Sequence, residues 1–207
     1  PGEFNSGDFS AVDAMVADPN FPNRVWFGSN AGYGFIDDGV MTMSPSDDIS
    51  GAVGDIAIAA DGSYMLIGMN NCRVYRSDGT DYTTFEIMSG PGSVENVLPQ
   101  SNLGRVRVAI SPDDSDHAFA AYATSGGFFG GLYHTGNAGD IWSNVWPNEI
   151  YEATPLPRAQ GIYDLALGVK KGQPDLAYVG GIELWRSGPN QQAELAAYAF
   201  DFAGTNI

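Results

Sequence analysis

The stretch Asp13-Ala14-Met15-Val16-Ala17 begins a strand pattern that returns three times along the chain. The copies are Asp55-Ile56-Ala57-Ile58-Ala59, Arg107-Val108-Ala109-Ile110-Ser111 and Asp164-Leu165-Ala166-Leu167-Gly168. Each copy is followed by a polar turn and then by a second short apolar run. A supersecondary unit that recurs every 42 to 57 residues indicates a repeat architecture, and the repeat decides the fold class.

Each repeat contains four candidate strands. The second strands are Arg24 to Gly28, Ser63 to Gly68, His117 to Ala123 and Leu176 to Gly180. The third strands start at Phe35, Val74, Leu132 and Leu184. The fourth strands are Met41 to Met43, Phe85 to Met88, Trp142 to Trp146 and Ala197 to Phe202. Four short strands per repeat are typical of β-propeller blades. We therefore expect an all-β propeller of four-stranded antiparallel blades in one domain, residues 1–207. The four blades span roughly 10–48, 52–90, 104–147 and 161–203, as part of a larger ring with further blades.

The charge of the chain excludes some partners. It has 25 Asp and Glu against 9 Lys and Arg, a net charge of −16. Such a surface repels nucleic acid and anionic membranes, and no apolar run reaches the roughly 20 residues of a membrane span. Cys72 is the only cysteine, so no intrachain disulfide forms. Few lysines with abundant Asp, Gly, Ser and Asn are common in secreted bacterial proteins, and an extracellular or outer-surface location is expected.

The segment from Thr135 to Trp142 resembles an Asp-box, the turn motif of BNR, sortilin and xyloglucanase-like propellers. The matching positions are Thr135, Asn137, Gly139 and Trp142 in this copy, and Ser77, Asp78 and Phe85 in a looser second copy. The resemblance implies a propeller of the kind found in secreted bacterial surface proteins. In the Asp-box the Asx side chain binds turn N–H groups and the aromatic tucks beneath. We predict that Asn137 does so and that Trp142 is buried.

The sequence favours recognition over catalysis. A sialidase needs an arginine triad, and its Arg-Ile-Pro signature is absent; a xyloglucanase-like carboxylate is absent from the turns that follow the second strands. Glycoside hydrolysis requires two carboxyls about 5–10 Å apart. We expect a noncatalytic module for adhesion or complex assembly, without catalytic residues or a cofactor. The propeller portion of a secreted glycoside hydrolase, with its carboxyls in further blades, remains the alternative, and a component of the type IX secretion and gliding apparatus is a third possibility.

Two sets of residues are candidates for ligand contacts. Asp13, Asp55 and Asp164 stand at the starts of innermost strands, where a channel mouth would gather them to bind a cation or a basic group; the alternative is hydrogen bonding to their own turns. Ca²⁺ is a candidate ion, although the sequence specifies no metal. Phe128, Phe129 and Tyr151 lie in Gly- or Pro-flanked loops, where aromatic side chains would contact a protein or glycan at the cell surface.

Overall fold

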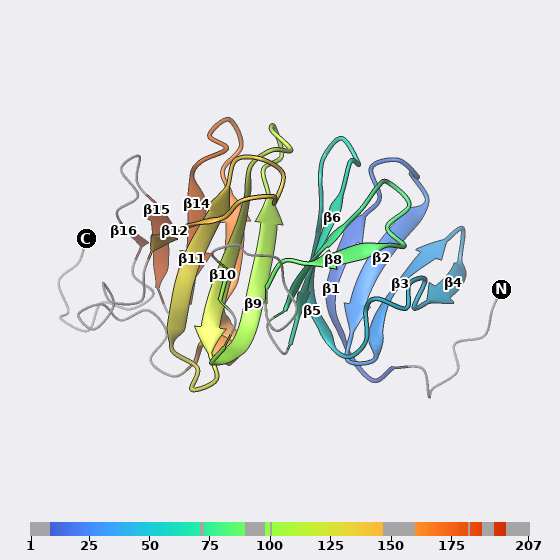
Figure 1. Ribbon diagram of the computed structural model, residues 1–207, viewed down its shortest axis with the longest axis horizontal. Helices are drawn as coiled ribbons and strands as arrows, with labels where there is room; N and C mark the ends of the chain where they lie inside the picture. Colours follow the sequence, from blue (N-terminus) through green and yellow to red (C-terminus); the bar gives the residue numbers. More distant parts are fainter. Residues whose placement is uncertain are drawn as a thin grey trace.

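The computed structural model describes residues 9–70, 73–89, 98–99, 101–146, 160–181, 183–187 and 193–197. Over these residues the chain forms four antiparallel sheets of four strands each, with the strands of every sheet in sequence order (Figure 1). The expected all-β fold with four four-stranded blades is confirmed. The one helix of the described residues, α1 (Gly161–Asp164), is four residues long, so this part of the chain contains no helix that could cross a membrane.

The four sheets are named blades 1 to 4 in chain order. Blade 1 consists of β1 (Val12–Ala17), β2 (Arg24–Ser29), β3 (Gly32–Asp37) and β4 (Val40–Met43). Blade 2 consists of β5 (Val53–Ile58), β6 (Met65–Met69), β7 (Val74–Ser77) and β8 (Phe85–Ile87). Blade 3 consists of β9 (Leu103–Ile110), β10 (Ala118–Thr124), β11 (Phe129–Thr135) and β12 (Ser143–Trp146). Blade 4 consists of β13 (Ala166–Val169), β14 (Ala177–Gly180), β15 (Leu184–Ser187) and β16 (Ala193–Ala197).

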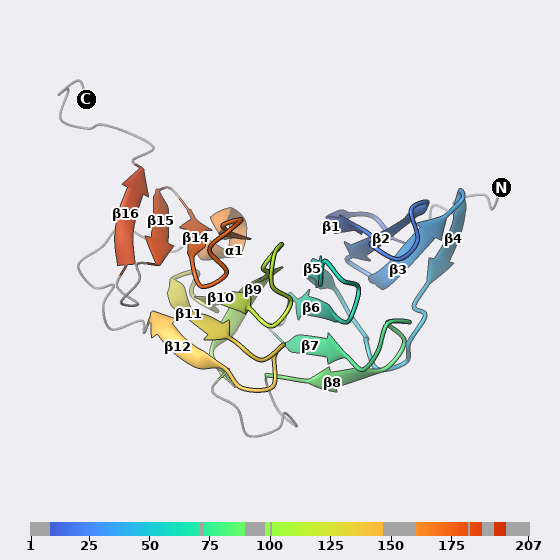
Figure 2. The same cartoon turned by 90° about the horizontal axis from the view of Figure 1, so that it is seen from above.

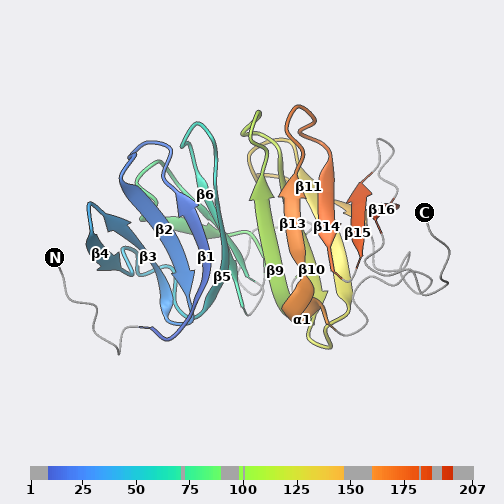
Figure 3. The ribbon, with the colours of Figure 1, turned by 180° about the vertical axis from the view of Figure 1, so that it is seen from behind.

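The blades are arranged radially in an open arc. Figure 2 shows β1, β5 and β9, the first strands of blades 1 to 3, on the inside of the arc and the fourth strand of each blade on its outer rim. Seen from behind, the four inner strands lie side by side, and α1 leads into β13 (Figure 3). This arrangement places the β1–β2, β5–β6 and β7–β8 turns at one end of blades 1 and 2.

A separate apolar core fills each junction between neighbouring blades. One cluster joins Trp26 and Tyr33 of blade 1 to Met65 and Ile67 of blade 2. A second joins blades 2 and 3, and a third joins blades 3 and 4. Strands in the middle of a blade are therefore covered on both faces: all residues from Ala118 to Ala123 are buried. This explains why the second strands are apolar throughout rather than alternating.

Two glycines set the distance between blades. A Cβ on Gly28 of β2 would lie 2.5 Å from a methyl carbon of Val53, on the inner strand of the next blade. The equivalent contact recurs between Gly68 of β6 and Val106, at 3.0 Å. The absence of a side chain lets an inner strand approach the second strand of the preceding blade closely.

β3, β9 and β11 begin three or four residues earlier than the sequence predicts, and two details of blade 4 also differ. Asp164 does not begin an inner strand: it is the last residue of α1, and β13 starts at Ala166. The fourth strand of blade 4, expected around 197–202, is β16 at Ala193–Ala197. In both cases flanking polar residues were weak markers of the strand boundary.

Candidate functional site

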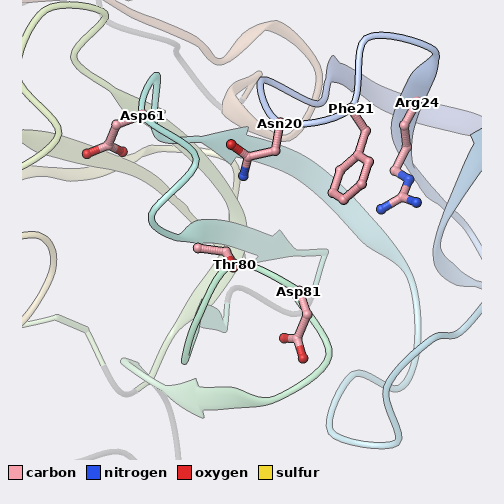
Figure 4. Close-up of a pocket in the computed structure, with 6 residues that line it drawn as sticks. All are labelled: Asn20, Phe21, Arg24, Asp61, Thr80 and Asp81. Carbon is pink, nitrogen blue, oxygen red and sulfur yellow. The ribbon is translucent and has the colours of Figure 1, made fainter.

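A hollow of about 390 Å³ opens between blades 1 and 2, where the β1–β2, β5–β6 and β7–β8 turns meet (Figure 4). Its lining residues come from these turns and from the start of β2. They are Asn20, Phe21, Arg24, Asp61, Thr80 and Asp81. None of these six residues was expected at a site from the sequence. The sequence feature that could have indicated this site is the repeated order of strand, turn and strand. In an antiparallel sheet of this order the first and third turns of each blade lie at the same end.

The β1–β2 turn is held in shape by the buried carboxylate of Asp18. One oxygen, Oδ1, accepts the backbone N–H groups of Asn20 and Phe21, at 2.8 and 3.3 Å. The other, Oδ2, accepts the indole N–H of Trp26, at 2.8 Å. Charged acceptors make stronger hydrogen bonds than neutral ones. Asp18 therefore ties the turn to the core beneath it and fixes where Asn20 and Phe21 enter the hollow.

Arg24 fills one wall of the hollow. Its Nε and Nη2 both donate to Asp37 Oδ2, at 3.0 and 2.6 Å, and its Nη1 lies 3.9 Å from Asp18 Oδ2. The guanidinium carbon lies 4.0 Å from the ring centre of Phe21 and 4.6 Å from that of Phe35. Figure 4 shows Phe21 and Arg24 side by side. Because Phe21 is braced by Arg24 and still 44% exposed, it presents an aromatic surface to a ligand.

The opposite edge of the hollow is the β5–β6 turn. Asp61 Oδ1 accepts the backbone N–H and the hydroxyl of Ser63, at 3.0 and 2.7 Å. These hydrogen bonds lower the pKa of Asp61, so its carboxylate is ionised at neutral pH. A general acid for glycoside hydrolysis needs a raised pKa instead. Asp61 is therefore suited to binding a ligand and not to donating a proton.

Gly62 connects the two sides of the hollow. Its carbonyl accepts the hydroxyl of Tyr82, at 2.9 Å, and the side-chain amide of Asn20, at 3.4 Å. Tyr82 is buried, and burial raises its pKa to about 12, so it stays a hydrogen-bond donor at neutral pH. The Asn20 bond holds the β1–β2 turn against the β5–β6 turn, and the Tyr82 bond holds the β7–β8 turn against it.

Replacing Gly62 with alanine is expected to destabilise the protein and to disturb the hollow. Gly62 has φ +71°, and a Cβ there would lie 2.2 Å from the Asn20 amide nitrogen. The left-handed backbone alone costs alanine about 1–2 kcal/mol, and the Asn20 amide must turn away from the added Cβ, which loses its bond to the Gly62 carbonyl at a cost of about 1 kcal/mol. Gly39→Ala is the matched control, because Gly39 has φ +82° with open space around it. Urea denaturation of both variants would separate the two effects; equal losses would contradict the contact with Asn20.

The three carboxylates expected at the channel mouth have different environments. Asp13 is exposed on β1, whereas Asp55 Oδ2 accepts the N–H of Val108 in the next blade, at 2.9 Å. Burial raises the pKa of Asp55, an effect opposed by the Val108 hydrogen bond and by Arg107, 3.7 Å away. Asp164 is at the end of α1. Among the described residues, no group of three or more acidic, His or Cys side chains is placed to hold a metal ion, so these three aspartates do not converge on one.

Arg107 takes the position that aspartate has in the other repeats, and it joins three blades. Its Nη1 donates to the carbonyl of Gly54 in blade 2, at 2.5 Å, and its Nε to that of Leu165 before β13, at 2.9 Å. Asp55 and Arg107 thus connect neighbouring blades at the inner edge of the arc.

The predicted aromatic contacts are only partly available. Phe128 is 58% exposed in the β10–β11 turn. Phe129 is not a loop contact: it belongs to β11, is buried, and packs near Trp146 in the core between blades 3 and 4. In a strand covered on both faces the side chains of both faces point into a core, and the Phe-Phe pair alone did not reveal that Phe129 belongs to such a strand. Tyr151 lies outside the described residues.

The β11–β12 turn has the geometry expected from its sequence. Asn137 Oδ1 accepts the N–H of Ile141, at 2.9 Å, and the hydroxyl of Thr135, at 2.8 Å. Trp142 is fully buried, and its indole N–H donates to the carbonyl of Gly139, at 2.9 Å. Gly139 has φ +96°, as the turn requires. The predicted acceptor role of Asn137 and burial of Trp142 are confirmed.

The β7–β8 turn is built differently. Ser77 Oγ accepts the N–H of Met65, at 2.8 Å, and Phe85 is buried. Asp78 is exposed, and its backbone N–H bonds the carbonyl of Thr84. The carboxylate that accepts the N–H of Phe85, at 2.9 Å, belongs to Asp48 of the β4–β5 connection.

The comparisons with known proteins concern the fold. No protein-family model and no curated protein matches the sequence. A GH74 enzyme of Niastella koreensis is similar in structure, with a TM-score of 0.65 and 14% identity over 91% of this chain and 31% of that one. The WD40 repeats of RRP9 give 0.61 and 8% identity, over 89% of this chain and 50% of theirs. A YCF48 structure with a bound D1 peptide gives 0.52 and 12%, over 94% of this chain and 52% of that one.

At these identities the similarity is one of fold, and the chain spans about half or less of each of these proteins. They include enzymes and protein-interaction domains with one architecture in common. A shared fold does not establish a shared function. The chain has the β-propeller fold.

Proposed function

We propose that this chain is a noncatalytic recognition module that binds a protein or glycan through the hollow between blades 1 and 2. The observation that carries the proposal is the composition of the hollow. An exposed aromatic ring is braced by a guanidinium and faces amide, hydroxyl and ionised carboxylate groups. Exposed aromatics beside polar groups are common anchors in binding sites.

The location and context belong to the same proposal. The acidic, lysine-poor composition supports display outside the cell or on its outer surface, and the turn from Thr135 to Trp142 supports kinship with Asp-box propellers of secreted bacterial proteins. A role in the type IX secretion and gliding apparatus is one setting for such a module. Ca²⁺ remains a candidate ligand of the acidic surface.

We also propose that the arc is part of a larger ring. Met15 and Val25 lie on the face of blade 1 that turns away from blade 2. Met15, which pairs with Phe27, is 71% exposed, and Val25 is 36% exposed. An apolar sheet face of this kind is normally covered by the next blade. Further blades of the same protein would cover it.

Binding assays with hollow variants test the function. Glycan and peptide arrays probed with the wild-type chain should identify a ligand, and Phe21→Ala should weaken its binding at least tenfold, because an anchoring ring is lost. Ile141→Ala is the matched control: Ile141 is 66% exposed and lies outside the hollow. Equal binding by Phe21→Ala and the control would overturn the hollow as the binding site.

The rival function is glycoside hydrolysis, which the fold of GH74 enzymes accommodates. Two carboxylates, Asp61 and Asp81, line the hollow, but the lowered pKa of Asp61 opposes a role as acid. We therefore expect any bound oligosaccharide to be recovered uncleaved. Hydrolysis that Asp61→Asn or Asp81→Asn abolishes would replace the recognition proposal with an enzymatic one.

A further inference from the structure

The two histidines of the chain meet at one end of blade 3. His117 precedes β10, and His134 lies near the end of β11. His117 Nδ1 and His134 Nε2 are 3.0 Å apart. A contact this short between two imidazole nitrogens requires a proton shared between them, because two lone pairs facing each other would repel. The same two nitrogens can instead bind a metal ion that lies to one side of the line between them.

The distance between the nitrogens suits a metal chelate. Zinc binds imidazole nitrogen at about 2.0–2.1 Å, so two such nitrogens on one ion at roughly 90–110° lie about 3.0–3.4 Å apart. Both rings are carried by ordered backbone. The N–H of Ser111 bonds the carbonyl of His117, at 2.8 Å, and the ring of His134 packs on Phe119, with ring centres 4.6 Å apart.

The surroundings favour a cation. Asp114 Oδ2 lies 3.9 Å from His117 Nε2, the nitrogen that does not face His134. A carboxylate beside the outer nitrogen is a frequent arrangement for metal-binding histidines, because it orients the ring. Asp114 thus places a negative charge beside the pair.

The pair is accessible and available for coordination. The side chain of His117 is 25% exposed. At Gly136 an added Cβ would lie 3.7 and 3.9 Å from the Cε1 atoms of His117 and His134, so the glycine leaves room beside both rings.

We infer that His117 Nδ1 and His134 Nε2 form a two-histidine binding site for a divalent transition-metal ion. Imidazole ligands suit Zn²⁺, Cu²⁺ and Ni²⁺, whereas Ca²⁺ and Mg²⁺ prefer oxygen. Because the described residues contain no third His, Cys, Asp or Glu grouped with the pair as a ligand, water or a bound partner would complete the coordination. The site is at the junction of blades 3 and 4 and is independent of the hollow.

Titration of the whole chain with Cu²⁺ and Zn²⁺ tests the site. We expect one ion per chain, Cu²⁺ electron paramagnetic resonance showing two coordinated nitrogens, and at least tenfold weaker binding in His134→Gln and in His117→Gln. Excess Ca²⁺ or Mg²⁺ should not compete. Asp47→Asn, an exposed carboxylate in the β4–β5 connection, is the control and should bind as the wild type does.

Two results would overturn the inference. One is unchanged affinity in the double variant His117→Gln/His134→Gln, which would place any bound ion on the acidic surface. The other is Cu²⁺ bound without two nitrogen ligands. Circular dichroism should show that the variants are folded; if His134→Gln is not, His117→Gln alone decides the outcome.

Discussion

Trp142→Ala is expected to lower the free energy of unfolding by about 3–5 kcal/mol, the usual cost of truncating a buried tryptophan. Trp142 is fully buried between blades 2 and 3, in a cluster with Tyr64, Val74 and Tyr133. Its removal leaves a cavity at this junction and the carbonyl of Gly139 without its indole donor. Urea denaturation followed by circular dichroism measures the loss.

Two milder variants separate the contributions. Trp142→Phe keeps most of the apolar bulk but not the N–H donor, so we expect an intermediate loss. Asn137→Ala removes the acceptor for the N–H of Ile141 and should cost about 1 kcal/mol. If Trp142→Ala lost no more stability than Asn137→Ala, the turn would not depend on the packing of its aromatic residue.

Local patterns were sufficient to predict the turn of Asn137 and Trp142 because its contacts lie within eight residues. The blade repeat was visible for the same reason: each strand, turn and strand is adjacent in sequence. The hollow depends instead on contacts between residues distant in sequence, such as the bond from Asn20 to the carbonyl of Gly62. No periodicity or motif indicates which turns of two neighbouring blades will meet.

The aspartates of the inner strands also show that contacts between blades cannot be predicted from the repeat alone. Asp13 and Asp55 have equivalent places in the repeat, yet Asp13 is exposed and Asp55 bonds the next blade. The difference lies in the facing strand, where Arg107 stands beside Asp55. The substitution of arginine for aspartate in the third repeat was the only sequence signal of this contact between blades.

Asp18→Ala is expected to be about as damaging as Trp142→Ala, although Asp18 is a small polar residue in a turn. The side chain of Asp18 is fully buried and accepts hydrogen bonds from Trp26, Asn20 and Phe21. Alanine would leave the buried indole N–H of Trp26 unpaired and remove one of the carboxylates near Arg24. Removing one partner from a buried charged network costs about 3–5 kcal/mol.

Asp18→Asn is the informative companion, because the amide keeps the size and one acceptor oxygen but loses the second acceptor and the charge. We expect its free energy of unfolding to lie between those of the wild type and Asp18→Ala. Asp47→Asn, a change of equal charge at an exposed site, should leave stability nearly unchanged.

Asp18→Ala should also weaken ligand binding at the hollow, because the β1–β2 turn that carries Phe21 loses its anchor. Phe21→Ala should weaken binding with little effect on stability. If Asp18→Ala unfolds at the wild-type urea concentration, the carboxylate is not what joins this turn to the core, and the rigidity we assign to this wall of the hollow has another source.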